Sequence, residues 1–233
     1  MHKILLAALA VALILPATAS ARIIEIGDIG TPATPSCPTT PCEVISRTTA
    51  YQTRIGAEKD MFVVPRDGRI VAWTITLGTP AKRQLKFFTE NLGGAAQAGI
   101  SVLRAGKKMT RRVTAASPAE TLTPYFGQTV QFPLITSLPV AKGQIVALSV
   151  PTWAPALALG VGNDYAWRAS RDVEGCDDTQ TQSVQSAVGD LGTYKCFYRT
   201  ARLAYSATVV TTPVPPKPPK QPKPKEPQRA GTR

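Results

Sequence analysis

Histidine is almost absent from this 233-residue chain: its single copy, His2, lies at the extreme N-terminus, in a segment that we expect to be removed. Without an imidazole, the mature chain lacks the residue that Ser-His-Asp and Cys-His catalysis, His-ligated zinc and histidine general bases require. The sequence also has no G-x-S-x-G, S-x-x-K, P-loop or G-x-G-x-x-G motif. Enzymes compatible with this composition would use carboxylates, tyrosine, lysine or bound calcium.

Long apolar runs are equally scarce, and the one clear case covers residues 4–15. Small residues follow it, with Ala19 and Ala21 forming an A-x-A cleavage site. This pattern predicts a signal peptide at residues 1–21 and a mature chain that starts at Arg22. A membrane anchor is the alternative, but the run is shorter than the roughly 20 residues that span a bilayer. We therefore expect a secreted or cell-envelope protein with no transmembrane helix in its mature form.

Acidic residues are few, at 15 against 27 lysines and arginines, which leaves a net charge of +12. Such a charge favours anionic partners such as a cell-wall polymer, a polysaccharide, lipid head groups or nucleic acid. Residues 213–233 are rich in proline and lysine and predict a disordered, extended tail. The tail would act as a spacer, an electrostatic tether or a ligand of a proline-binding domain.

Residues 47–212 show the period-two alternation of β-strands. In GRIVAWTITLG, starting at Gly68, the side chains of Val71, Trp73, Ile75 and Leu77 share one face. Further short runs lie at residues 61–64, 84–88, 100–103, 129–132, 144–150, 157–161, 193–198 and 202–209. No segment after residue 21 predicts an amphipathic helix. We expect an all-β fold, a jelly-roll-like two-sheet β-sandwich at residues 47–212, preceded by an extended leader at residues 22–46.

Three blocks within residues 62–167, VPRDGRIVAWTITLG, KFFTENLGGAAQAGISVLR and FPLITSLPVAKGQIVALSVP, support a resemblance. The chain resembles secreted β-sandwich proteins of unknown function from actinomycete-type bacteria. The resemblance implies the fold and no activity.

The four cysteines, Cys37, Cys42, Cys176 and Cys196, form an even set in an exported protein and predict two disulfides. Three pairings are open, and we favour the local one, Cys37 with Cys42 and Cys176 with Cys196. A metal site lacks a partner histidine, and neither pair has the C-x-x-C spacing of a redox centre.

An acidic loop around residues 164–178 contains the weak calcium candidates Asp172, Glu174, Asp177 and Asp178. Carboxylates suit calcium, but their spacing does not match a D-x-D-x-D-G loop. Because Arg168 and Arg171 lie nearby in the sequence, we expect a salt-bridged, solvated loop. We predict no bound metal and no cofactor.

Aromatic residues in turn-rich surroundings give a candidate ligand platform of Trp153, Trp167 and Tyr125. Sugar rings stack on exposed aromatic faces, whereas large aromatics more often belong to the core. Pro151 and Pro155 flank Trp153, so Trp153 is the member that we expect to be most exposed.

A basic hairpin is predicted around Gly106, with the candidate anion-binding residues Arg104, Lys107, Lys108, Arg111 and Arg112. Clustered cations attract phosphate, sulfate or carboxylate groups, although a solvated loop is the alternative. No aromatic residues are interleaved for stacking on bases, so we expect no specific nucleic-acid partner.

Together these features favour an exported non-enzymatic module that associates with the cell envelope or an anionic extracellular polymer. The alternative is a carbohydrate-binding or carboxylate-based carbohydrate-active β-sandwich protein. An enzyme of that kind would need two carboxyl groups about 5 to 9.5 Å apart.

Overall fold

The stretch GRIVAWTIT forms β4 (Gly68–Thr76), a central strand of one of two packed sheets. The computed structural model describes residues 20–28, 30 and 32–213. In it, Trp73 and Ile75 are fully buried on one face of β4, while Thr74 and Thr76 lie partly exposed on the other. The predicted alternation is confirmed from Trp73 to Thr76. It is wrong at the start of the strand, where a register shift between Ile70 and Ala72 places Ile70 in the core and leaves Val71 half-buried.

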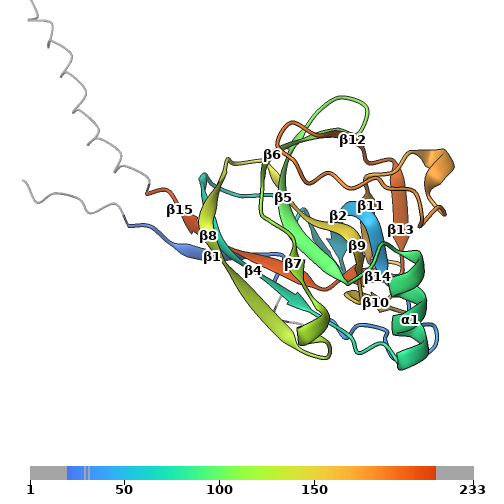
Figure 1. Ribbon diagram of the computed structural model, residues 1–233. Coiled ribbons are helices and arrows are strands. Elements are labelled where there is room, and N and C mark those ends of the chain that lie inside the picture. Colours follow the sequence, from blue (N-terminus) through green and yellow to red (C-terminus); the bar gives the residue numbers. More distant parts are fainter. Residues whose placement is uncertain (1–19, 29, 31, 214–233) are drawn as a thin grey trace, which may run out of the picture. The chain divides into compact units, whose positions relative to one another are not determined.

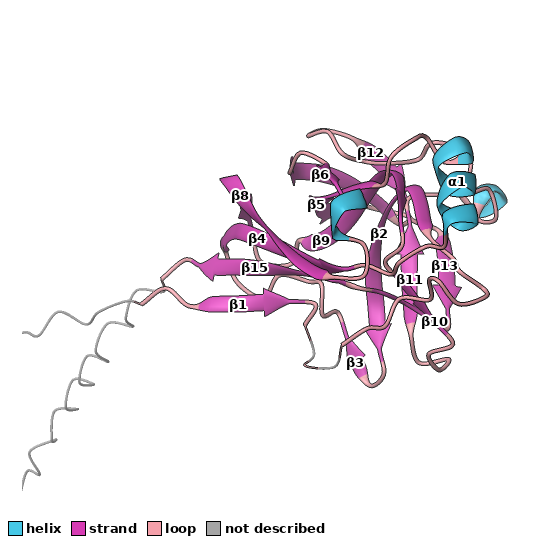
Figure 2. Cartoon of the chain, turned by 60° about the horizontal axis from the view of Figure 1, so that its bottom comes forward, coloured by secondary structure: helices cyan, strands magenta, loops and turns pink. Residues whose placement is uncertain are grey.

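Four strands form the smaller sheet, in which β4 lies between β15 and β8 and β1 pairs with the far side of β15 (Figures 1 and 2). Their bounds are β1 (Ile23–Ile26), β8 (Thr129–Val140) and β15 (Tyr205–Thr211). The larger sheet has the order β12-β6-β5-β9-β2-β11-β13, with β3 paired to β2 and β7 to β5. Its bounds are β2 (Ile45–Ile55), β3 (Glu58–Lys59), β5 (Gln97–Ala105), β6 (Thr110–Ala116), β7 (Glu120–Thr121), β9 (Ile145–Ala154), β11 (Ala166–Ala169), β12 (Leu191–Thr193) and β13 (Cys196–Arg199).

Eight of these strands have the connectivity of a jelly roll. If β1, β2, β4, β5, β6, β8, β9 and β15 are counted from first to eighth, the smaller sheet has the order 1-8-3-6 and the larger contains 5-4-7-2. Every pairing between them is antiparallel. Two interlocked Greek keys give this strand order. The predicted jelly-roll-like sandwich is confirmed.

An insert, residues 155–204, separates β9 from β15. It extends the larger sheet with β11 and β13 beside β2 and with β12 beside β6. It also contains a separate two-stranded ladder of β10 (Leu157–Leu159) and β14 (Ala201–Leu203). The second disulfide, Cys176–Cys196, lies entirely within the insert. Both disulfides have the local pairing that we favoured, as expected for a protein of an oxidising compartment.

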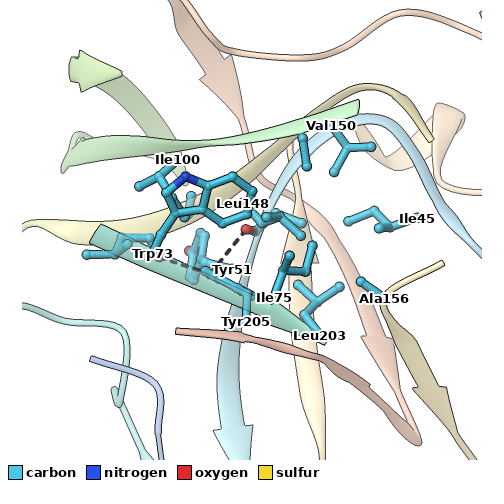
Figure 3. Close-up of a cluster of buried hydrophobic side chains, with 14 of the residues drawn as sticks. Ile45, Tyr51, Trp73, Ile75, Ile100, Leu148, Val150, Ala156, Leu203 and Tyr205 are labelled. Carbon is cyan, nitrogen blue, oxygen red and sulfur yellow. Dashed lines mark hydrogen bonds between the residues drawn. The ribbon is translucent and has the colours of Figure 1, made fainter. Parts of the chain in front are cut away.

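The core fills the space between the two sheets, and Figure 3 shows Trp73, Ile75 and Tyr205 facing Ile100 and Leu148. Tyr205 is almost completely buried, and its hydroxyl donates to the Val146 carbonyl at 3.0 Å. A buried hydroxyl needs such a partner because leaving it unbonded costs about 1 to 3 kcal/mol. The tyrosine therefore joins the sheets by a polar contact as well as by packing.

Burial raises the pKa of both Tyr194 and Tyr205. The ordinary tyrosine pKa is about 10, and the pKa in the folded chain is higher, so the folded chain holds these two protons more tightly than the unfolded chain. The resulting contribution to the free energy of unfolding is complete below about pH 10. It is lost as the pH rises further, since the unfolded chain then releases these protons first. In an ultraviolet titration we expect two of the six tyrosines to ionise only when circular dichroism reports unfolding. Tyr205→Phe should remove one of these late-ionising groups. Ionisation of all six with an intact native spectrum would contradict the prediction.

Helix α1 (Lys82–Asn91) replaces the strand predicted at residues 84–88, and that prediction is wrong. Leu85, Phe88 and Leu92 pack against the core while Phe87 is 57% exposed, which is a helical spacing of three and four residues. The Ala81 N–H donates to Gln84 Oε1 at 2.7 Å and satisfies one of the free donors of the first turn. Lysine, arginine, glutamine and leucine, all good helix formers, begin the helix.

The sandwich also begins earlier than predicted. The predicted leader contains β1, whose Ile23 pairs with Val210 of β15, and residues 22–212 form one compact unit. The first sheet strand thus lies in residues 22–46 rather than after them. The predicted signal peptide and the basic tail lie outside the described residues, apart from residues 20–21 and 213. Within the described ranges no helix has the length and apolar content to cross a bilayer.

Candidate functional site

The predicted basic hairpin forms between β5 and β6. The Gly106 N–H donates to the Thr110 carbonyl at 2.9 Å, and Lys108 has φ 50° in the turn. Arg104 and Arg112 are opposite each other in the strand register, and both are exposed. Their Cβ atoms lie about 5 Å apart in such a pair, and like charges placed there destabilise it. The hairpin therefore concentrates positive charge at the end of β5 and β6 where the two strands are joined.

Arg104, Lys107, Lys108 and Arg112, here called the hairpin cations, are all exposed. Two ion pairs occur among the described residues, Lys86–Glu90 and Lys195–Asp172, and neither includes a hairpin cation. Arg112 Nη1 donates to the Gly189 carbonyl at 2.8 Å. The positive charge of the hairpin is thus not neutralised by acids in the described part of the chain.

Arg111 does not join this exposed group, which corrects the predicted set. It is half-buried, its Nη2 donates to the Tyr51 hydroxyl at 3.2 Å, and its guanidinium lies 5.9 Å from the Tyr51 ring centroid. The alternation of β6 directs Arg111 to the face opposite that of Arg112. Its role is to pack under the insert.

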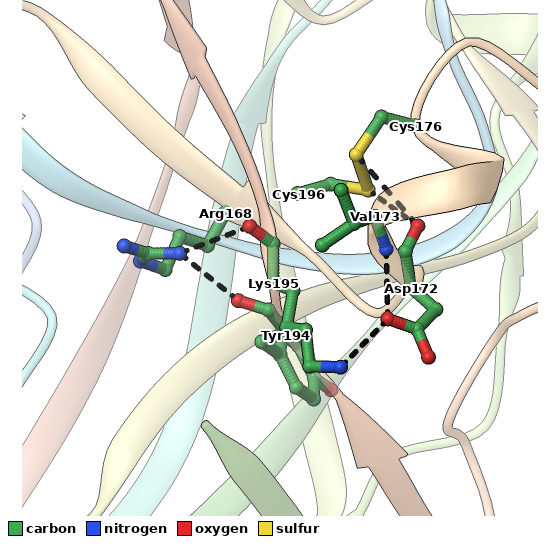
Figure 4. A network of polar contacts seen from close by, with 7 residues as sticks. All are labelled: Arg168, Asp172, Val173, Cys176, Tyr194, Lys195 and Cys196. Carbon is green, nitrogen blue, oxygen red and sulfur yellow. Dashed lines mark hydrogen bonds and ion pairs between the residues drawn. A yellow bond between two sulfur atoms is a disulfide. The ribbon is translucent and has the colours of Figure 1, made fainter. Parts of the chain in front are cut away.

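The acidic loop is held by local contacts, which Figure 4 shows around Asp172. Asp172 accepts hydrogen bonds from Lys195 Nζ at 2.9 Å and from the Val173 N–H at 2.8 Å. The hydrogen bond from Lys195 is the main cause that lowers the pKa of Asp172. Arg168 and Arg171 instead donate to backbone carbonyls of Tyr194 and Ser46. The predicted pairing of these arginines with the acids is therefore wrong, because Lys195 takes that place.

The calcium candidates do not converge. The Asp178 carboxylate accepts hydrogen bonds from Thr181 and Gln180, which lower its pKa, while Glu174 and Asp177 are exposed. Over the described ranges no three acidic, cysteine or histidine residues are grouped closely enough to hold a metal ion.

The candidate aromatic platform is not formed. Trp153 is 0% exposed, packs against Phe88 and Phe126, and donates from Nε1 to the Gly94 carbonyl at 2.8 Å. The expectation that it is exposed is wrong, because β9 continues through it. Pro151 lies where a register shift interrupts the pairing of β9 with β2, so its missing N–H removes no ladder bond.

The other two members of the platform are separated from Trp153. Trp167 is 6% exposed and stacks on Tyr198 with ring centroids 4.2 Å apart. Tyr125 is half-buried and lies edge-on to Phe132 at 5.3 Å. Both rings are occupied by aromatic neighbours, so the three residues offer no common face for a sugar.

A strap, residues 177–190 of the insert, covers polar residues on the outer face of the larger sheet. The Gln185 carbonyl accepts hydrogen bonds from Thr49 at 3.1 Å, Ser101 at 2.9 Å and Ser149 at 3.1 Å, which come from three strands. All three hydroxyl residues are at most 3% exposed. Since the strap buries these groups, this part of the sheet is not a free binding surface.

A hollow of about 330 Å³ lies on the outer side of the smaller sheet, next to the loop that follows β1. Its polar lining comes from that loop, β4, β8, β14 and β15, through Asp28, Thr74, Thr76, Thr129, Arg202 and Ser206. Thr76 and Thr129 share a hydrogen bond at 2.9 Å. The hollow has the size of a small-ligand site, for which 300 to 1,000 Å³ is typical.

Arg202 gives the hollow its positive charge. It is 7% exposed, and burial lowers its pKa, while Tyr165 and Asp28 act in the opposite direction. The loop reaches this position through Gly27, which has φ +88° and whose added Cβ would lie 2.2 Å from the Phe62 ring. Only glycine fits so close to that ring.

The residues of the hollow were not predicted from the sequence. The available signals were an arginine inside the apolar run ARLAY and the outward threonines of β4. A charged residue in an apolar strand indicates a partner or a ligand, because burying an uncompensated charge is costly. No family model, curated protein or solved structure matches this chain. The resemblance to secreted actinomycete-type proteins stays a prediction.

Proposed function

We propose that this protein is an exported, non-enzymatic module that attaches to the cell envelope or to an anionic extracellular polymer. The observation that carries the proposal is the pair of directly opposed arginines, Arg104 and Arg112, with Lys107 and Lys108 beside them and no acid paired to any of the four in the described chain. An anionic group between the arginines would remove their mutual repulsion. The net charge of +12 adds attraction at longer range.

The expected strength follows from the number of cations. Each lysine or arginine close to an anionic surface contributes about 1 kcal/mol. At physiological salt the interaction is screened over about 8 Å, so binding should weaken steeply as salt is added. The predicted tail would contribute further cations to the same polymer.

The second candidate is a carbohydrate-binding function. Jelly rolls include lectin domains, although fold alone does not decide function. The burial of Trp153 and Trp167 removes the aromatic platform. The hollow beside Arg202 is the observation that favours saccharide binding in another place.

A triple variant, Arg104→Gln, Lys107→Gln and Lys108→Gln, tests the principal proposal in the mature chain. We expect about tenfold or greater weakening of binding to dextran sulfate and to a polyuronate, because up to 3 kcal/mol of attraction is lost at low salt. The matched control is Lys82→Gln, Arg83→Gln and Lys142→Gln, which removes the same charge from exposed positions. Affinity measured against salt concentration should show a shallower dependence for the hairpin variant only. Equal weakening in both triple variants would show that net charge acts without the hairpin.

A further inference from the structure

We propose that the free edge of β13 binds an extended acidic segment of a partner protein, which adds a strand to the larger sheet and places a carboxylate beside Arg199. β13 is the last strand in the order of the larger sheet, at the edge opposite β12. The hairpin cations lie on the other side of β9, β2 and β11 in that order. Binding at β13 would therefore add a protein partner to the proposed attachment without using the same residues.

The backbone of β13 directs hydrogen-bonding groups away from its neighbour. In an antiparallel pair, alternate residues of a strand bond to the partner strand and the residues between them point away from it. The Thr200 N–H donates to the Tyr165 carbonyl at 3.1 Å, in continuation of the register of β13 on β11. Counted back by two, Tyr198 also bonds to β11, so Phe197 and Arg199 direct their N–H and C=O groups to the free edge. The Arg199 carbonyl accepts a hydrogen bond from Thr200 Oγ1 at 2.7 Å, which uses one of its two lone pairs. An open edge of this kind is a template for a further strand.

The side chains on one face of this edge form a basic and aromatic surface. Phe197 is 42% exposed, and the guanidinium carbons of Arg168 and Arg199 lie 4.7 Å and 5.5 Å from its ring centroid. Arg168 is directly opposite Phe197 on β11. Its Nη1 donates to the carbonyls of Tyr194 and Lys195 (Figure 4). Neither arginine is in an ion pair within the described chain. Because a guanidinium over a ring keeps N–H donors in its plane, the surface can still receive carboxylates.

These features define the segment that the edge would accept. Residues directly opposite each other in an antiparallel pair have Cβ atoms about 4.5 to 5.5 Å apart, so the residue facing Arg199 should be glutamate or aspartate. The residue two positions later faces Phe197 and should be aromatic or β-branched, because such cross-strand pairs are favourable. Thr200 has φ 58° and follows the last residue of the strand. The added strand is thus expected to be as short as β13 itself.

Other occupants match the edge less well. Residues 213–233 contain six lysines and arginines and one acid, Glu226, so this tail would be repelled. A second copy would pair through its own β13, which contains no acid, and would bring the arginines of both copies together. An anionic polysaccharide could contact the arginines, but it lacks the backbone amides that pair with a strand edge. These occupants are outcomes of the test.

The test is a calorimetric and NMR titration of the mature chain with capped heptapeptides. The probe is Thr-Thr-Glu-Thr-Phe-Thr-Thr, and a second peptide has lysine in place of glutamate. A third carries N-methyl groups on the backbone nitrogens of glutamate and phenylalanine, which keeps its charge but removes the two N–H donors that would face β13. A fourth is N-methylated only on the threonine between them, whose N–H would point away, and is the matched control. We expect the probe and the fourth peptide to bind about tenfold or more tightly than the others. The amide protons of Phe197 and Arg199 should gain protection from exchange.

Variants of the chain test the same pairing from the other side. Arg199→Glu should reverse the preference, so that the lysine peptide binds more tightly than the glutamate peptide. Phe197→Ser should weaken binding of the probe severalfold. Leu191→Ser, at a 56% exposed position on β12, and Arg83→Gln, at an exposed position of α1, are the controls and should leave it unchanged. All four positions are exposed, so each variant should keep the wild-type melting temperature.

Equal binding of the glutamate and lysine peptides would overturn the inference, as would the absence of binding at millimolar concentration. Equal binding of the third peptide would show that charge acts without an added strand, which also overturns it. A dimer that sedimentation detects and that Phe197→Ser abolishes would mean that a second copy takes the edge.

The two proposals fail separately. The hairpin triple variant should bind the glutamate peptide as the wild type does while its retention on dextran sulfate weakens. Hairpin-dependent retention without peptide binding would reject the strand addition at β13 and leave the attachment in place. Peptide binding without a hairpin effect would reject the attachment mechanism alone.

Discussion

Trp153→Ala should lower the free energy of unfolding by about 3 to 5 kcal/mol, the range for removing a buried large aromatic side chain. The indole is fully buried between Phe88 of α1 and Phe126, so alanine would leave a cavity at the junction of the helix and the larger sheet. The hydrogen bond to the Gly94 carbonyl would be lost as well. For a domain of this size we expect the melting temperature to fall by about 10 °C.

Trp153→Phe separates packing from hydrogen bonding. Phenylalanine keeps most of the apolar surface but leaves the Gly94 carbonyl without its donor, which should cost about 1 to 3 kcal/mol. Chemical denaturation of both variants gives the comparison. If Trp153→Ala cost less than about 1 kcal/mol, as surface substitutions do, the side chain would be exposed and the original platform hypothesis would regain support.

The fold could be predicted because its signals are local. Period-two alternation such as that of β4 depends on neighbouring residues, and the favoured disulfides join cysteines only 5 and 20 positions apart. The helix was not predicted because Leu85 and Phe87 have the spacing of two residues that is typical of a strand. The distinguishing residue, Leu92, lies beyond residues 84–88, and its burial depends on contact with the rest of the core.

The hollow could not be predicted because its residues are brought together by topology. Asp28 follows β1, Thr74 lies on β4, Thr129 on β8 and Ser206 on β15, and the jelly roll places the first and eighth strands side by side. No spacing in the sequence expresses that pairing. Likewise, the proline residues around Trp153 suggested a loop. The register shift that accommodates Pro151 within β9 could not be predicted, because it depends on the pairing with β2.

Removing the insert's disulfide with Cys176→Ser and Cys196→Ser should lower the free energy of unfolding by about 3 kcal/mol, the chain-entropy value for a loop of this size. We expect the loss to appear first in the strap. The strap is tied to the sheet mainly by hydrogen bonds from polar groups, such as those from Thr49 and Ser101 to the Gln185 carbonyl, and it buries little apolar surface of its own. Segments of this kind open locally at a lower free energy than the core.

Hydrogen exchange and limited proteolysis would locate the effect. In the variant, the Ser183 N–H, which donates to the Arg47 carbonyl at 2.9 Å, should exchange much faster, and cleavage should concentrate in residues 177–190. Amides of β4 and β9 should keep their protection, because the jelly-roll core does not contain the disulfide.

Cys37→Ser with Cys42→Ser is the matched control. It removes a five-position ring at a cost of about 2 kcal/mol and should leave strap protection unchanged. If the Ser183 N–H exchanged at the same rate in the variant with Cys176→Ser and Cys196→Ser as in the wild type, the hydrogen bonds would hold the strap without the disulfide. Uniform loss of protection in β4 and β9 would instead mean that insert and sandwich unfold as one unit, so that the strap is part of the folding core rather than a cover over its polar face.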